Sequence, residues 1–354
     1  MANFGFEKIK RSNEGEVTQN QLYVTYDQIC QCDCLGCRNK GLPKEEMESN
    51  RKLLNHAIMK NAEKFRHIIF GGGEPLYQID HIVKVIHKIK KRREKIRHKL
   101  IRLLKGKTVE DDKISFSMTT NGERNGFLGS IDQRCWYCHQ FDRIILSRYH
   151  YDDHVNDQLF RANGTLMTAY DIRNLCGALR NKMQLSCLCQ EGGIQTSDDI
   201  LHYIEWGKCF GIRDIMFSNY QQDITPDDAK QKDCDTEVFK KVQRILVEEQ
   251  GYELLDTFVF SAGYKISTYR KPTIFDGIDK MSIMIGISLI TGRVDGGIFQ
   301  PIFDEDEGCT ISFREFITEE EIEKEWSGAK KRTYNYSAMP NGAMYADWSC
   351  KNLI

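Results

Sequence analysis

The sequence carries little net charge and has no long hydrophobic run. Its 50 Lys and Arg residues are balanced by 51 Asp and Glu residues, a formal net charge of −1, so the chain as a whole is not drawn to nucleic acid or to a membrane surface. The longest nearly unbroken apolar stretch, residues 281–290, is too short to span a bilayer. The first residues, MANFGFEK, lack the charged and apolar regions of a secretory signal. These absences predict a cytoplasmic protein with no membrane partner.

The remaining composition is that of an ordinary soluble domain. Hydrophobic residues make up 40% and charged residues 29% of the 354 positions, which is enough for a sizeable core. Thirteen cysteines are present, and in a cytoplasmic protein they are better explained as reduced thiols and metal ligands than as disulfides.

Four of these cysteines lie within eight positions, directly after a strand-like run over residues 22–26. Cys30, Cys34 and Cys37 are spaced C-x3-C-x2-C, with Cys32 between them. Three thiolates on a short loop suit a cubane iron–sulfur cluster that keeps one iron without a protein ligand. Three other interpretations stay open at this point: ordinary reduced thiols, a zinc site, or Cys32 in place of one member of the trio. A zinc knuckle would need a second Cys or His pair at matching spacing, and none follows nearby.

A glycine run, Gly71-Gly72-Gly73-Glu74-Pro75, ends a short β-branched strand predicted over residues 67–70. Glycines let the backbone approach a ligand closely, and such a turn at the carboxyl end of a strand exposes amides and carbonyls to a polar group. By itself the run could also be a plain tight turn.

Together, the cysteine loop and the Gly-Gly-Glu-Pro turn resemble the signature of the radical S-adenosylmethionine (SAM) enzymes, over residues 21–250. The resemblance implies that Cys30, Cys34 and Cys37 hold a [4Fe-4S] cluster whose fourth iron chelates SAM. It implies a reductive cleavage of SAM to a 5′-deoxyadenosyl radical, which takes hydrogen from a substrate, and an electron donor such as flavodoxin or ferredoxin. The chain departs from the family at Gly36, where an aromatic residue usually packs near the adenine.

The same resemblance implies which residues hold SAM. Gly72, Gly73 and Glu74 would bind its amino group through the backbone and the carboxylate. Asn121 belongs to the Thr-Asn-Gly that commonly ends the third strand in the family, and Ser147 stands where relatives contact the ribose with a hydroxyl.

Strand-like and helix-like segments alternate along residues 21–250. Strands are predicted over residues 22–26, 67–70, 114–122, 143–150, 183–189 and 214–218, and helices over residues 44–65, 78–105, 164–180, 197–210 and 235–250. Successive strand–helix units require a parallel sheet with right-handed crossovers. Six such units resemble the partial (βα)6 barrel of the radical SAM core, so we expect an α/β fold of this type. Residues 1–20 are predicted to be an N-terminal arm, and residues 251–354 a β-rich extension that covers the open side of the barrel.

The other cysteines allow several roles. Cys187 and Cys189 near the end of the fifth predicted strand either approach SAM and the substrate or are buried apolar thiols. Cys135 and Cys138 match the C-x-x-C-H haem pattern, but we expect paired core thiols or, with less support, an auxiliary metal site. Residues 251–354 contain only Cys309 and Cys350, so a full auxiliary cluster in the extension is not expected.

We therefore expect a radical SAM enzyme. Its substrate is expected to be a peptide or a small metabolite or nucleotide rather than RNA, bound near polar residues that follow the strands: His150, His154, Gln190, Glu191, Asn219 and Tyr220. The alternative is a non-catalytic zinc- or iron–sulfur-stapled protein that binds nucleic acid through the basic helix 84–105.

Overall fold

The computed structural model describes most of the chain and leaves several segments out. The described residues are 17–34, 37–41, 49–103, 114–124, 139–175, 177–219, 234–260, 264–272, 309–316, 321, 324–325, 331–345 and 353. The predictions for Gly36, Tyr220, Cys135, Cys138 and Cys350 lie outside this part of the chain.

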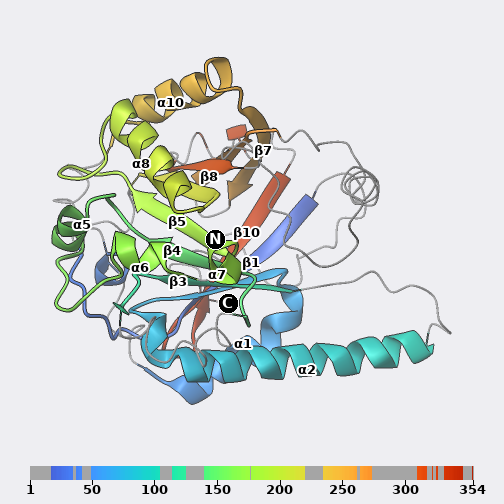
Figure 1. The fold of residues 1–354 in the computed structure, drawn as a ribbon. Helices are drawn as coiled ribbons and strands as arrows, with labels where there is room; N and C mark the ends of the chain where they lie inside the picture. Colours follow the sequence, from blue (N-terminus) through green and yellow to red (C-terminus); the bar gives the residue numbers. More distant parts are fainter. Residues whose placement is uncertain are drawn as a thin grey trace, which may run out of the picture.

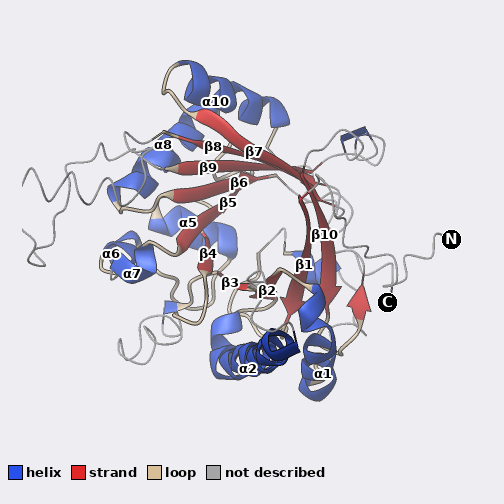
Figure 2. Ribbon diagram, turned by 90° about the vertical axis from the view of Figure 1, so that its right-hand side faces the viewer, coloured by secondary structure: helices blue, strands red, loops and turns tan. Residues whose placement is uncertain are grey.

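Six parallel strands form one half of a strongly curved sheet (Figure 2). In chain order they are β1 (Val17–Thr25), β2 (His67–Gly71), β3 (Ser115–Thr120), β4 (Arg143–Ser147), β5 (Met183–Leu188) and β6 (Asp214–Ser218). Each pairs in parallel with the next. The predicted α/β fold with six parallel strands is therefore confirmed, and these six strands do not close on themselves.

The C-terminal strands lie within this sheet. They are β7 (Glu253–Phe260), β8 (Tyr264–Arg270), β9 (Thr310–Phe316), β10 (Lys331–Ala338) and the short β11 (Met344–Tyr345). β9 pairs in parallel with β6, and the pairing continues through β8, β7 and β10 to β1. The C-terminal strands thus fill the gap between β6 and β1 by backbone hydrogen bonding.

β1 is longer than the sequence predicts. It begins at Val17, and residues 17–20 pair with residues 331–334 of β10. The assignment of residues 1–20 to an arm is therefore wrong for the last four of them. The reason is that their hydrogen-bonding partner lies more than 300 positions away in the sequence, where no local pattern can indicate it.

The helices lie on the outer side of the curved sheet (Figures 1 and 2). They are α1 (Arg51–Asn61), α2 (Ile79–Leu103), α5 (Asp153–Phe160), α6 (Ala169–Arg173), α7 (Gly177–Arg180), α8 (Ser197–Cys209) and α10 (Thr236–Glu248), with 3-10 turns at Arg38–Gly41, Ala62–Lys64 and Pro75–Gln78. In the described residues, no helix is both long enough and apolar enough to cross a bilayer.

Two helix predictions need correction between β4 and β5. The single helix expected over residues 164–180 is replaced by α6 and α7, because Thr168 and Asp171 form a capping box that starts α6 only at Ala169. The residues between the predicted strand 143–150 and the predicted helix 164–180 contain α5, for which no helix is predicted. Its N-cap is Asp152, whose carboxylate accepts a hydrogen bond from the Val155 amide.

The two faces of the sheet differ in polarity. Side chains that face the helices are apolar and buried, as at Leu185, Phe217 and Phe313. The alternating positions point to the inside of the curved sheet, and several of them are buried and polar: Ser117, Gln184, Ser218, Ser312, Asn335 and Ser337. Closed parallel barrels usually fill this inner region with branched apolar side chains. Here the polar positions share the inner face with an aromatic cluster in which Phe260 stacks on Tyr264 and Phe316 packs against Tyr264.

His67 on the inner face gives the fold a predictable pH dependence. Its Nε2 lies 2.7 Å from the Ser117 hydroxyl, and burial lowers the pKa of its imidazole to about 4. Between about pH 6.5 and pH 4 the unfolded chain therefore takes up a proton that the folded chain does not, so stability falls as the pH is lowered, by up to about 3 kcal/mol.

We expect the His67→Gln variant to lose this pH-dependent part of the unfolding free energy. Urea unfolding of the wild type and the variant from pH 7 to pH 4 measures it, since the difference between the two isolates His67 from other titrating groups. Parallel pH profiles for the two proteins would contradict the assignment.

Candidate functional site

The cysteine loop follows the carboxyl end of β1. Cys30 is exposed, and Cys32, Cys34 and Cys37 are half-exposed. The Cys32 amide lies 3.4 Å from Cys30 Sγ, and the Cys32 thiol contacts both Cys30 and Cys34. The contact with Cys32 lowers the pKa of Cys30 to about 7, while burial raises the pKa of Cys37. A lowered pKa favours the thiolate, which is the form that binds metals.

These thiols fit an iron–sulfur cluster by their chemistry and their common loop. In the described residues, no three Cys, His, Asp or Glu side chains are gathered into a metal-binding geometry. The assignment of Cys30, Cys34 and Cys37 as ligands therefore stays a prediction.

The glycine turn packs its backbone directly on the cysteine loop. The Glu74 amide donates to the Ile29 carbonyl at 2.7 Å. Gly73 has φ +54°, and a Cβ atom there would lie 2.5 Å from the same Ile29 oxygen. A side chain at this position is thus excluded both by the backbone conformation and by the approach of the two loops.

Glu74 connects the ends of two strands. Its side chain is buried, and its carboxylate accepts hydrogen bonds from the Leu76 amide, the Thr120 hydroxyl and the Asn121 amide at 3.0, 2.6 and 2.8 Å. Burial raises the pKa of this carboxyl to about 7. The sequence motif did not indicate this internal role, and the contact with SAM predicted for Glu74 is a separate expectation.

The Asn121 side chain links the end of β3 to the cysteines. Its Nδ2 donates to Cys30 Sγ and to Cys32 Sγ, both at 3.3 Å. Its Oδ1 accepts a hydrogen bond of 2.9 Å from Gln31 Nε2. Gly73, Glu74 and Asn121 are thus brought together against residues 29–32, and Gly72 packs against Thr25 at the end of β1.

Ser147 lies further along the same edge of the sheet. It is the last residue of β4, is half-buried and pairs with Ser186 of β5. Its predicted contact with the SAM ribose stays a prediction.

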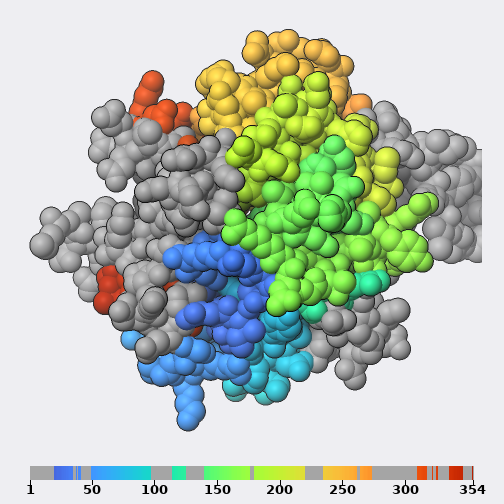
Figure 3. Space-filling view, turned by 90° about the vertical axis from the view of Figure 1, so that its left-hand side faces the viewer, coloured from blue at the N-terminus to red at the C-terminus, as the bar shows by residue number. Residues whose placement is uncertain are grey.

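The other side of the cysteine loop contacts the end of α5. Phe160 O accepts from the Asp33 amide at 3.1 Å, and Gln31 O accepts from the Asn163 amide at 2.7 Å. Cys32 also forms an antiparallel bridge with Ala162. Figure 3 shows the dark blue segment of the cysteine loop against the green segment that follows β4. No local sequence signal marks this contact.

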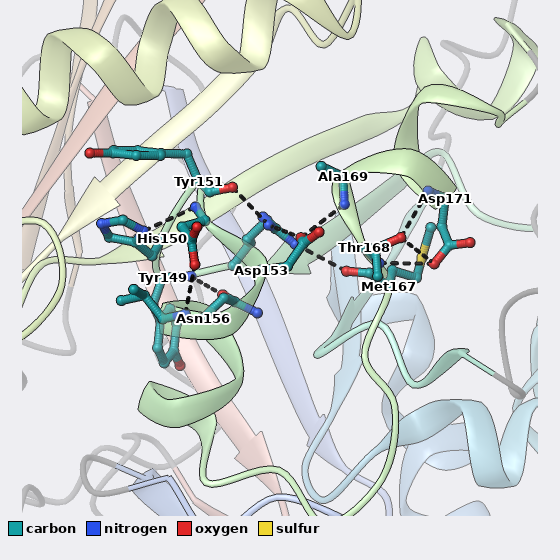
Figure 4. A network of polar contacts seen from close by, with 12 residues as sticks. Tyr149, His150, Tyr151, Asp153, Asn156, Met167, Thr168, Ala169 and Asp171 are labelled. Carbon is teal, nitrogen blue, oxygen red and sulfur yellow. Dashed lines mark hydrogen bonds and ion pairs between the residues drawn. The ribbon is translucent and has the colours of Figure 1, made fainter.

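Several expected site residues are not at an open surface. Cys187 and Cys189 are fully buried in the core, which agrees with the second of their two predicted roles. Gln190 and Asn219 are buried as well, and Asn219 Oδ1 accepts a hydrogen bond from the Phe316 amide. His150 and His154 remain partly exposed after β4, on the loop shown in Figure 4 and on α5.

Replacement of Gly73 by alanine tests the close approach of the two loops. Gly73→Ala is expected to destabilise the fold by roughly 2–4 kcal/mol, because it adds a clash with Ile29 O to the strain of a positive φ. Gly251→Ala is the matched control: its φ is +72°, and a Cβ there meets nothing within 4 Å. We expect only about 1 kcal/mol for the control. If denaturant unfolding gives equal losses of unfolding free energy for the Gly73→Ala and Gly251→Ala variants, the close approach of the two loops does not matter for stability.

Comparison with known proteins gives one family-model match and several similar solved structures. Residues 14–132 match the family model described as a 4Fe-4S single cluster domain. Curated proteins give no match.

Three solved structures illustrate the similarity. Streptococcus suis SuiB, bound to precursor peptide SuiA, is 13% identical with a TM-score of 0.43, over 65% of this chain and 46% of that one. anSMEcpe with bound AdoMet and Cp18Cys peptide is 14% identical with a TM-score of 0.46, over 66% and 59%. Escherichia coli HemN, described as a radical SAM enzyme, is 13% identical with a TM-score of 0.36, over 67% and 54%.

The matched region spans about half the length of the SuiB and HemN chains. The family-model match covers about a third of the chain and includes the cysteine loop. Residues 14–132 are thus similar to a 4Fe-4S single cluster domain, in agreement with the iron–sulfur cluster expected from the spacing of Cys30, Cys34 and Cys37.

Proposed function

We propose that the protein is a radical SAM enzyme that abstracts hydrogen from its substrate. The observation that carries the proposal is the joining of the cysteine loop, the Gly-Gly-Glu turn and Asn121 at the carboxyl ends of neighbouring parallel strands. In parallel barrels this edge is where ligands bind. A loop of ordinary structural thiols would not need a glycine turn and a strand-end amide held against it.

Each residue of the site has a proposed role. Cys30, Cys34 and Cys37 would hold the [4Fe-4S] cluster, and Gly72, Gly73, Glu74, Asn121 and Ser147 would hold SAM. When bound, these two cofactors supply an electron and a 5′-deoxyadenosyl radical, which is the difficult part of the chemistry.

The protein's own contribution is orientation. The side-chain amide of Asn121 donates from Nδ2 to Cys30 Sγ at 3.3 Å. This hydrogen bond stabilises negative charge on the thiolate. The buried Glu74 carboxylate holds the Asn121 backbone in place. The chain must also keep water and stray hydrogen donors away from a reactive radical.

We propose a peptide or a small metabolite or nucleotide as the substrate. It would bind near the carboxyl ends of the strands, beside the cysteine loop, because ligands bind at this edge in parallel barrels. Electron transfer would come from a protein such as flavodoxin or ferredoxin in the cytoplasm.

The nucleic-acid-binding alternative is not favoured. The lysines expected to carry it, Lys84, Lys88, Lys91 and Lys95, lie exposed on the outer surface of α2. An exposed run of like charge is the common state of a solvated helix face. The family match, in contrast, concerns the cysteine loop itself.

Anaerobic reconstitution tests the proposal. The wild type is expected to bind about four iron and four sulfide per chain and to form 5′-deoxyadenosine from SAM on reduction. Cys34→Ala should lose this activity by at least a hundredfold, since the cluster loses a ligand. Cys209→Ala, at an exposed cysteine of α8, should keep it. Stoichiometric zinc without SAM cleavage in the wild type, or full activity in the Cys34 variant, would refute the assignment.

A further inference from the structure

Arg148 directly follows Ser147 and is one of the largest fully buried side chains of the protein, with 2% exposed. Its Nη1 donates to Met167 O and its Nη2 to Tyr151 O, each at 3.0 Å. The guanidinium lies over the Trp206 ring, 4.8 Å from its centroid. A buried cation is unfavourable unless it is paired and hydrogen-bonded, so these partners hold the guanidinium in one position.

The charge partner of Arg148 is Asp153, the first residue of α5. Asp153 Oδ1 accepts from Arg148 Nη2 and also from the Ala169 amide at the start of α6, at 2.9 Å. Figure 4 shows Asp153 between the Tyr151 loop and the Thr168–Ala169 turn. The ion pair therefore fixes the N-terminal ends of two helices to the buried end of β4.

α5 connects the Arg148–Asp153 ion pair with the cysteine loop. The helix has eight residues, a length of about 12 Å, and its far end provides the contacts of Phe160 O with the Asp33 amide and of Asn163 with Gln31 O. The Tyr149 ring stacks on Phe160 at 4.2 Å and stiffens the connection. At the junction, Arg161 adopts a left-handed conformation with φ 46°, which is unusual for a residue other than glycine.

The cysteine loop thus has two independent anchors. One is Asn121 with Glu74, on the side of β3. The other is α5, held by Asp153 and Arg148. Both act on residues 30–33, but only the second depends on an ion pair outside the loop itself, between the buried Arg148 and the half-exposed Asp153.

We infer that Arg148 is a positioning residue of the proposed radical SAM site: through Asp153 and α5 it sets the position of Cys32 and Asp33, and with it the arrangement of the cluster loop toward SAM. The inference rests on the proposed function. It adds a residue that follows Ser147 in the chain and whose guanidinium bonds instead to Met167, Tyr151 and Asp153.

Asp153→Asn is the main test, because it keeps the side-chain shape and removes the charge of the pair. In the cluster-free protein, backbone amide exchange at Asp33 and Asn163 is expected to become at least tenfold faster. Arg148→Lys should have the same effect, since an ammonium cannot reproduce the two directed N–H contacts. In the reconstituted protein, we expect a several-fold rise in KM for SAM and a changed electron paramagnetic resonance signal of the reduced cluster with SAM.

Lys208→Met is the matched control. Lys208 is also a buried cation. Its ammonium is paired with Glu205 on α8 at 2.8 Å and lies over the Tyr252 ring, 5.8 Å from the ring centroid. Its loss should lower stability but leave exchange at Asp33 and Asn163, the KM and the resonance signal unchanged.

The outcomes separate the two proposals. A wild type without cluster or SAM cleavage refutes the proposed function, and the inference that rests on it. A competent wild type whose Asp153 variant keeps normal amide exchange, or normal KM and resonance signal, refutes the role of Arg148 alone. So does an equal effect of Lys208→Met.

Discussion

The buried Glu74 carboxylate is the interaction on which the site depends. A carboxylate withdrawn from water is stable only when hydrogen bonds replace its hydration, and three donors do so here: the Leu76 amide, the Thr120 hydroxyl and the Asn121 amide. These donors come from the turn after β2 and from the end of β3. Leaving any of these groups unpaired would cost free energy, so the ends of β2 and β3 keep a fixed position relative to each other. The Asn121 side chain extends this constraint to Cys30 and Cys32 by its hydrogen bonds.

The two faces of the curved sheet are packed differently. Apolar side chains of the strands pack under the helices on the outer face, as where Phe313 of β9 meets Phe239 of α10. The inner positions combine hydroxyl and amide groups with an aromatic cluster around Phe260 and Tyr264. Since β7 to β10 complete the pairing between β6 and β1, the proposed substrate site is bounded by the C-terminal strands as well as by the cluster domain.

Two scales of constraint act on the cysteine loop. Backbone contacts with the glycine turn are local and steric, and they require Gly73 because a Cβ atom would meet the Ile29 carbonyl. The contact with α5 is longer in range and rests on an ion pair at the opposite end of the helix, in which Arg148 is buried and Asp153 is half-exposed. A loop that must bind a cofactor without rearranging benefits from both, because preorganised ligands lose less conformational entropy on binding.

The sequence by itself determined the parallel α/β fold, the approximate limits of the strands β2 to β6 and the cysteine spacing that predicts an iron–sulfur cluster. These features depend on local signals: β-branched runs, helical periodicity and the spacing of Cys30, Cys34 and Cys37. Only the tertiary structure decided that residues 17–20 belong to β1, that the C-terminal strands enter the sheet, and that α5 and Arg148 support the cysteine loop. Each of these depends on partners far apart in the chain, such as Val17 with Lys331 or Asp33 with Phe160, and hydrogen bonds between distant segments form only once the chain has folded.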